Sequence, residues 1–250
     1  MKLLIPLKTV TRYFLYFAQE LSNGGIPTTI IAASEAAREG KRLFPNFEWI
    51  EQERNITGYP ELVIGEVVAS LNSNWFLRLD SDEWISPEMI RKISATTASL
   101  DKSVVYGFER RWIGISPIDG KVAYRNYGRM YWKKSSIHDT SVSLHDQNYR
   151  LFHSDYVYQS RTLHGVGVVG GTYGSLEQFG PIYHLDWLIN LKNKAKIQSS
   201  QLSRFSIMNF NNFNDVYSCE DSSDAGEWKF DENLNYITDT LITMHNKEKK

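Results

Sequence analysis

Strand-like and helix-like segments alternate from the start of the chain to about residue 80, and this alternation limits the possible folds most strongly. Short runs of apolar or β-branched residues predict buried strands at 2–7, 27–33, 47–50 and 75–79. Apolar residues at helical spacing predict helices at 11–21, 34–43 and 60–71. Such alternation predicts an α/β fold, with a mostly parallel sheet flanked by helices and ligands bound at the carboxyl ends of its strands.

The later part of the chain has a different character. Residues 104–115 and 129–132 are strand-like, 166–174 form a glycine-dense segment that we interpret as a loop, and 209–224 are polar. Helices are predicted at 187–205 and 231–245. We therefore expect a catalytic domain over 1–205, followed by a C-terminal extension of loop and helix over 206–250.

Composition limits the class of protein. Of the 250 residues 42% are hydrophobic, enough for a sizeable core, and a formal charge of -1 gives no reason to expect nucleic acid as a partner. The single cysteine, Cys219, excludes an internal disulfide framework and favours a reducing compartment. The longest apolar runs fall well short of a transmembrane segment, so we expect a cytoplasmic protein.

A group of carboxylates follows the strand predicted at 75–79 and precedes a predicted helix start at Ser86 and Pro87. The helix dipole explains acidic residues near that start, such as Glu88 and also Glu83. It does not explain Asp80 and Asp82, which come directly after the strand. An extended backbone would point both of these side chains to the same side. Two carboxylates held so close need neutralisation, and a hard divalent cation supplies it.

The sequence Leu79-Asp80-Ser81-Asp82-Glu83, followed by Ser86-Pro87-Glu88, resembles the Asp-x-Asp metal motif of GT-A glycosyltransferases, particularly the family-2-type group. Two later segments also match that group: Arg150-Leu151-Phe152 resembles a strand downstream of the motif, and 181–187 resembles the segment that carries a late histidine, here His184. The resemblance covers about residues 1 to 205 and implies a Rossmann-like GT-A fold.

The resemblance also implies an activity. A sugar would be transferred, with inversion, from a nucleoside-diphosphate sugar bound by the N-terminal half to a glycan or lipid-linked saccharide bound by the C-terminal half, as in polysaccharide biosynthesis. The metal, Mn²⁺ or Mg²⁺, would be held by Asp80, Asp82 and His184. Donor binding would fall to Asp80, Arg78 and Arg150, because guanidinium groups hold diphosphate oxygens well.

The catalytic base is less defined by the sequence. Related enzymes often carry His-Glu where this chain has His164 followed by glycine. The candidates for the group that accepts the acceptor's hydroxyl proton are therefore His164, Glu177 and Asp186, with Glu109 as a further one.

Other functions compete with this interpretation. Aromatic residues make up 13% of the chain, which suits a non-catalytic carbohydrate-binding module, but such a module gives no reason for carboxylates at a strand end. A sugar nucleotidyltransferase usually has a glycine-rich basic loop after its first strand, and residues 8–12 contain no glycine. A dehalogenase-type phosphatase needs Thr or Val two residues after its second aspartate, where Trp84 stands.

Overall fold

The structure is a computed structural model that describes residues 1–52, 64–115, 122–126, 147–155, 157–158, 168–169, 172–185 and 234. It divides the chain into two compact units. The first comprises Met1–Glu109 with Gln147–Pro181, and the second comprises Arg110–Asp146 with Ile182–Lys250. The predicted strand at 129–132, the predicted helices at 187–205 and 231–245, and the expected boundary near 205 lie outside the described residues, apart from Leu234.

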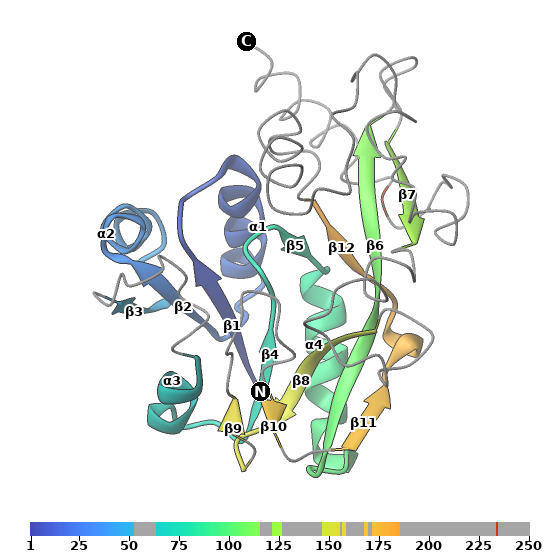
Figure 1. Ribbon diagram of the computed structural model, residues 1–250. Helices are drawn as coiled ribbons and strands as arrows, with labels where there is room; N and C mark the ends of the chain where they lie inside the picture. The colour runs from blue at the N-terminus through green and yellow to red at the C-terminus, as the bar shows by residue number, and fades with distance from the viewer. Residues whose placement is uncertain are drawn as a thin grey trace, which may run out of the picture. The chain divides into compact units, whose positions relative to one another are not determined.

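Four parallel strands form one side of the sheet in the first unit, in the order β3-β2-β1-β4 (Figure 1). They are β1 (Lys2–Leu7), β2 (Thr28–Ala33), β3 (Glu48–Gln52) and β4 (Trp75–Arg78). The helices between them are α1 (Arg12–Asn23), α2 (Ser34–Leu43) and α3 (Ile64–Ser70). The predicted alternation is confirmed, and 2–7 and 34–43 match their observed elements at both ends.

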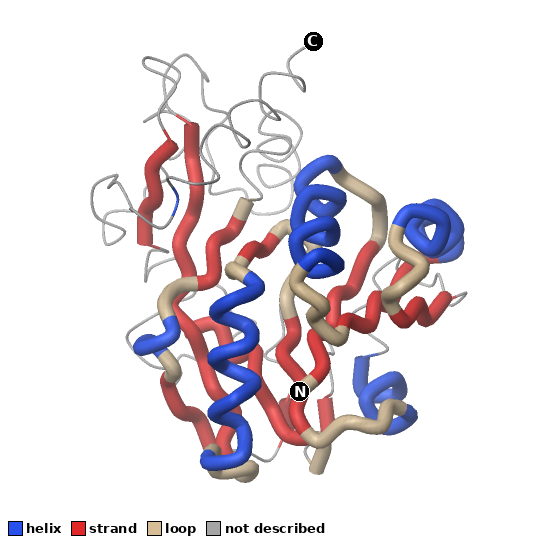
Figure 2. Tube along the Cα trace, turned by 180° about the vertical axis from the view of Figure 1, so that it is seen from behind, coloured by secondary structure: helices blue, strands red, loops and turns tan. Residues whose placement is uncertain are grey.

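The sheet of the first unit continues beyond β4 with β8 (Gln147–His153), which runs antiparallel to β4 and to β6 (Val104–Ile115). Strand β11 (Thr172–Ser175) then pairs parallel to the first half of β6. Helix α4 (Pro87–Thr96), followed by the short helix η2 (Thr97–Ser99), lies with α1 on the face of the sheet seen in Figure 2. This is the expected Rossmann-like arrangement of a mostly parallel sheet flanked by helices.

An apolar core joins strands that are distant in the sequence. Leu4, Ile31, Phe76, Val105 and Phe152 belong to one buried cluster, to which α3 adds apolar side chains. The rings of Phe76 and Phe152 stack with centroids 5.9 Å apart across β4 and β8. Burying each such side chain contributes about 1.5–3 kcal/mol, so the centre of the sheet is its most strongly held part.

Two helix starts follow from single side chains. The hydroxyl of Thr11 accepts a hydrogen bond from the backbone N–H of Phe14 and caps α1. The hydroxyl of Ser86 accepts from the N–H of Met89 at 3.2 Å, and Pro87 begins α4. The helix start predicted at Ser86 and Pro87 is confirmed.

The glycine-dense segment at 166–174 is not a loop throughout. It contains β10 (Val168–Val169), which pairs with β9 (Val157–Tyr158), and most of β11. A Cβ on Gly174 would lie 2.7 Å from Val104 Cγ1, so β11 needs a glycine there to approach β6. The loop prediction is wrong at these strands, and for β11 the reason is that its partner β6 is a distant segment, which no local pattern reveals.

In the second unit, the later half of β6 pairs antiparallel with β7 (Val122–Asn126) and parallel with β12 (Ile182–His184). The guanidinium carbon of Arg111 lies 4.2 Å from the centre of the Tyr124 ring across the β6–β7 pair. Such cation–π contacts stabilise a hairpin modestly. In neither unit do the described residues include a helix long and apolar enough to cross a membrane.

Candidate functional site

Asp80 lies where the strand order of the parallel sheet reverses. Strand β1 has β2 on one side and β4 on the other, because the chain builds β2 and β3 outward before returning to β4. In open α/β sheets ligands bind at this point, beyond the carboxyl ends of the two strands. The N–H of Leu79 still donates to the carbonyl of Leu4 on β1 at 3.0 Å, and Asp80 follows directly. The chain therefore carries a carboxylate to the ligand-binding edge of its fold.

A tight turn follows Asp80. The N–H of Glu83 donates to the carbonyl of Asp80 at 3.0 Å, and Ser81 and Asp82 are the two central residues. The expectation that an extended backbone points Asp80 and Asp82 to the same side is wrong in its premise, because the backbone turns between them. Asp82, in the middle of the turn, is half-buried.

Two arginines hold the carboxylate of Asp80. Arg78 Nη2 donates to Asp80 Oδ1, and Arg150 Nη2 donates to Asp80 Oδ2 at 2.6 Å. The same Arg150 nitrogen also donates to Glu83 Oε1 at 2.7 Å. The side chains of Arg78, Arg150 and Glu83 are 9%, 5% and 0% exposed, whereas that of Asp80 is 28% exposed. These four groups, which we call the charge cluster, carry two positive and two negative charges.

Strand register brings the two arginines together. Trp75, Phe76 and Leu77 of β4 lie opposite His153, Phe152 and Leu151 of β8. Because the pair is antiparallel, the next position along places Arg78 beside Arg150. Like charges at such neighbouring positions destabilise a sheet unless anions lie between them, and here Asp80 and Glu83 supply them. Breaking a buried arrangement of this kind from one side costs about 3–5 kcal/mol.

The segment after the turn is fixed to helix α1. The indole Nε1 of Trp84, in the short strand β5 (Glu83–Trp84), donates to Glu20 Oε2 at 3.0 Å. The hydroxyl of Tyr16 donates to the other carboxylate oxygen of Glu20 at 2.8 Å. Trp84 is only 2% exposed. The burial of Trp84 and the Ser86 cap together fix the segment that follows the turn. The charge cluster fixes the segment that precedes it.

Glu83 is the residue whose place the sequence did not indicate. The helix-dipole explanation is wrong for it, because its carboxylate bonds Arg150 and its Oε2 accepts the Asp80 N–H at 2.9 Å. The signal that was present is an acidic residue directly before two large apolar residues, Trp84 and Ile85, which become buried. Its partner Arg150 lies 67 residues later, so the pairing depends on the fold.

The other predicted site residues lie in different parts of the chain, and some lie outside the described residues. His184 is buried on β12 in the second unit, opposite Trp112 of β6. Glu177 is exposed at the start of the short helix η3 (Glu177–Phe179) in the first unit, and Glu109 is half-buried on β6. His164 and Asp186 lie outside the described residues. The structure thus brings Asp80, Arg78 and Arg150 together and leaves the choice of base where the sequence left it.

The site can be compared with what a hard cation needs. Among the residues that the structure describes, no three His, Cys, Asp or Glu side chains form a ready metal cage. Mg²⁺, however, is often held by one or two carboxylates together with substrate phosphates. A carboxylate offers about four lone-pair positions, so Asp80 retains acceptor capacity beside its arginine bonds, and its side chain is partly exposed. Asp80, with Asp82 next to it in the turn, fits a metal that shares its ligands with a bound diphosphate.

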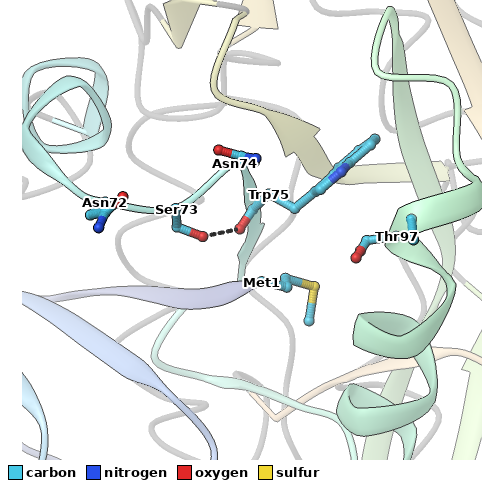
Figure 3. A pocket seen from close by; sticks show the side chains of 7 residues that line it. Met1, Asn72, Ser73, Asn74, Trp75 and Thr97 are labelled. Carbon is cyan, nitrogen blue, oxygen red and sulfur yellow. Dashed lines mark hydrogen bonds between the residues drawn. The ribbon is translucent and has the colours of Figure 1, made fainter.

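A pocket of about 470 Å³ opens at the opposite, amino end of the same strands (Figure 3). Its lining carries no charged side chain and consists of Met1, Asn72, Ser73, Asn74, Trp75, Thr97 and Ala98. The Ser73 hydroxyl donates to the carbonyl of Trp75 at 3.0 Å. This pocket has none of the groups that the predicted chemistry requires.

No family model and no curated protein matches the sequence. Among solved structures, one of TarS from S. aureus is 11% identical over 80% of this chain, with a TM-score of 0.46, and this chain covers only 38% of it. A shorter form, TarS 1-349, is also 11% identical, with 99% of this chain and 71% of that one covered and a TM-score of 0.45. HddC from Yersinia pseudotuberculosis complexed with GMP-PN is 10% identical, with 71% and 90% covered and a TM-score of 0.41. Likenesses this distant define no family for the chain.

Proposed function

We propose that this chain is a metal-dependent glycosyltransferase of the GT-A type. It would transfer a sugar from a nucleoside-diphosphate sugar to a hydroxyl of a glycan or lipid-linked saccharide, with inversion. The observation that supports this most strongly is the partly exposed Asp80 carboxylate beyond β4, at the switch in strand order. Asp82, which the proposed Asp-x-Asp role also requires, follows in the tight turn after Asp80.

In this proposal the donor diphosphate binds at the charge cluster. Asp80 and Asp82 would hold the metal, and Arg78 and Arg150 would provide positive charge near the phosphate oxygens. When bound, Mn²⁺ or Mg²⁺ supplies further positive charge for the departing nucleoside diphosphate. The low exposure of Arg78 and Arg150 strengthens their electrostatic interaction with any anion that reaches them.

The reaction itself would be a direct displacement. The acceptor oxygen forms a bond to the anomeric carbon while the bond from that carbon to the diphosphate oxygen breaks. A base removes the hydroxyl proton of the acceptor, and His164, Glu177 and Asp186 remain the candidates. Such a base contributes roughly 10²–10⁴-fold to the rate.

Binding of a panel of nucleoside diphosphates tests the proposal. UDP, GDP, ADP, CDP and dTDP are each titrated calorimetrically with Mn²⁺ and then with chelator. We expect one of them to bind at least about tenfold more tightly with Mn²⁺, and Asp80→Asn to remove that difference. The corresponding nucleotide-sugar should then release the same diphosphate in the presence of saccharide acceptors.

Other outcomes point to the alternatives. Release of pyrophosphate when a nucleoside triphosphate and a sugar phosphate are supplied would indicate a sugar nucleotidyltransferase. Binding of saccharide alone, with no response to any nucleotide, would indicate a carbohydrate-binding module. Either result would overturn the proposal.

A further inference from the structure

We propose that Glu83 is a positioning residue that restrains Arg150 and thereby leaves the Asp80 carboxylate able to accept a divalent cation. This inference rests on the proposed function and extends it, because Glu83 need not touch donor, acceptor or metal. It also changes the expected role of Arg150 from a donor-binding group to the partner of Glu83.

The geometry separates a fixed side of the charge cluster from an exchangeable one. Arg150 Nη2 lies between Glu83 Oε1 at 2.7 Å and Asp80 Oδ2 at 2.6 Å. The Glu83 side chain is fully buried, and its second oxygen accepts the Asp80 N–H at 2.9 Å. Both carboxylates accept hydrogen bonds through both of their oxygens, but the Glu83 side chain is fully buried, whereas that of Asp80 is 28% exposed and can exchange a partner with an incoming ligand.

Charge leads to the same division. Counting Arg78, Arg150, Asp80, Asp82 and Glu83 gives two positive and three negative groups, a formal charge of -1. Without the Glu83 charge the same group is neutral, and Arg150 would lose its fully buried carboxylate partner while keeping its bond to Asp80. A divalent cation would then meet a site without net attraction and a carboxylate held more firmly by arginine.

Arg78 differs from Arg150 in this arrangement. Its Nη2 bonds Asp80, the exposed member of the charge cluster, and it precedes that residue by only two positions at the end of β4. Because its partner is the exposed carboxylate, Arg78 is the arginine that we expect to interact with the diphosphate. Arg150 stays with the buried Glu83.

The test uses Mn²⁺ alone. Its affinity is measured from loss of the free-ion EPR signal, at a temperature where circular dichroism shows that the variants being compared are folded. Glu83→Gln keeps the shape and removes the charge, and we expect it to weaken Mn²⁺ binding about tenfold. Combining Glu83→Gln with Arg150→Gln returns the formal charge to -1 and should restore affinity to within about threefold of wild type. Glu83→Asp keeps the charge and should also retain affinity, even where it lowers stability.

If Glu83 only stabilises the fold, the variants should rank differently in Mn²⁺ affinity. The double variant would then bind Mn²⁺ no better than Glu83→Gln, and Glu83→Asp would lose affinity in step with its loss of stability. Either pattern overturns the inference, and the comparison of the double variant with Glu83→Asp decides it even where Glu83→Gln fails to fold. Glu88→Gln, on the exposed face of α4, is the matched control and should leave Mn²⁺ affinity unchanged.

Mn²⁺ binding by the wild-type protein distinguishes a failure of this inference from a failure of the proposed function. Absence of Mn²⁺ binding by the wild-type protein, both alone and with UDP or GDP, would overturn the metal-dependent function and the inference with it. Normal wild-type binding together with an unchanged Glu83→Gln variant would overturn the inference alone.

Discussion

The two ends of strand β4 have opposite chemistry. At the amino end Trp75 packs edge-on against His153, with ring centroids 5.2 Å apart, beside a pocket whose lining has no charged side chain. At the carboxyl end there are two arginines, Asp80 and the buried Glu83. The described pocket is therefore at one end and the charge cluster at the other. Because ligands in open α/β sheets bind at the switch in strand order, the charge cluster indicates the functional site better than the pocket does.

The residues between the two ends keep them distinct. Phe76 and Leu77 lie opposite Phe152 and Leu151, and all four are completely buried. This apolar layer excludes water from one side of the charge cluster and fixes the strands that carry Arg78 and Arg150. Changes at the carboxyl end should therefore alter ligand binding, whereas changes at the amino end should alter stability alone.

The largest effect is expected for Arg150→Leu. It leaves the fully buried Glu83 carboxylate without its 2.7 Å ion pair, so the free energy of unfolding should fall by about 3–5 kcal/mol in urea titrations. Adding Glu83→Leu to the same protein removes the stranded charge and should recover much of that loss. A double variant as unstable as the single one would show that the pair is not the source of the stability.

Trp75→Ala tests the amino end. Trp75 is 8% exposed and packs against His153 and Tyr106, so truncation should cost about 3 kcal/mol of unfolding free energy. Mn²⁺-dependent diphosphate binding, measured by calorimetry below the melting temperature, should nevertheless stay within about threefold of wild type. Loss of binding larger than this would mean that the two ends are coupled.

The sequence was a reliable guide wherever local patterns determine structure. The buried runs gave β1 and β4, the helical spacing gave α2, and Ser86 with Pro87 gave the start of α4. The carboxylates after β4 were recognised because a strand that ends in aspartate has few structural explanations.

What the sequence did not reveal depends on pairing between distant segments. Arg150 and Asp80 are 70 residues apart, and they meet only through the register of β4 with β8. The same holds for Glu83 and for strand β11 at the end of the glycine-dense segment, whose partner β6 lies far earlier in the chain. The turn at Ser81 and Asp82 was missed because the strand was assumed to continue.

A smaller effect is expected for the exposed ion pair near the amino ends of the strands. A hydrogen bond from Lys2, helped by one from Thr29, holds the pKa of the Glu48 carboxyl below its usual value. The unfolded chain therefore binds a proton at higher pH than the folded protein, and the stabilisation is present above the unfolded pKa and is lost as pH falls through the folded one.

Glu48→Gln should consequently reduce the unfolding free energy at pH 7 by at most about 1 kcal/mol, since 45% of this side chain is exposed. The difference from wild type should disappear in acid, below the folded pKa of Glu48, and should shrink in high salt. Urea titrations across the acid range measure it. A difference that is constant with pH would show that the ion pair is not responsible.

The most direct test of the metal-dependent site is calorimetric titration of wild type and Asp82→Asn with the diphosphate selected from the panel, each with Mn²⁺ and with chelator. The account predicts that wild type binds at least about tenfold more tightly with Mn²⁺ and that Asp82→Asn loses this difference. Thermal melts of the ligand-free proteins should meanwhile show Asp82→Asn as stable as wild type or slightly more so, because one of three neighbouring negative charges is removed. Equal affinity of wild type with and without Mn²⁺, or a destabilised Asp82→Asn that keeps its full response to metal and diphosphate, would contradict the account.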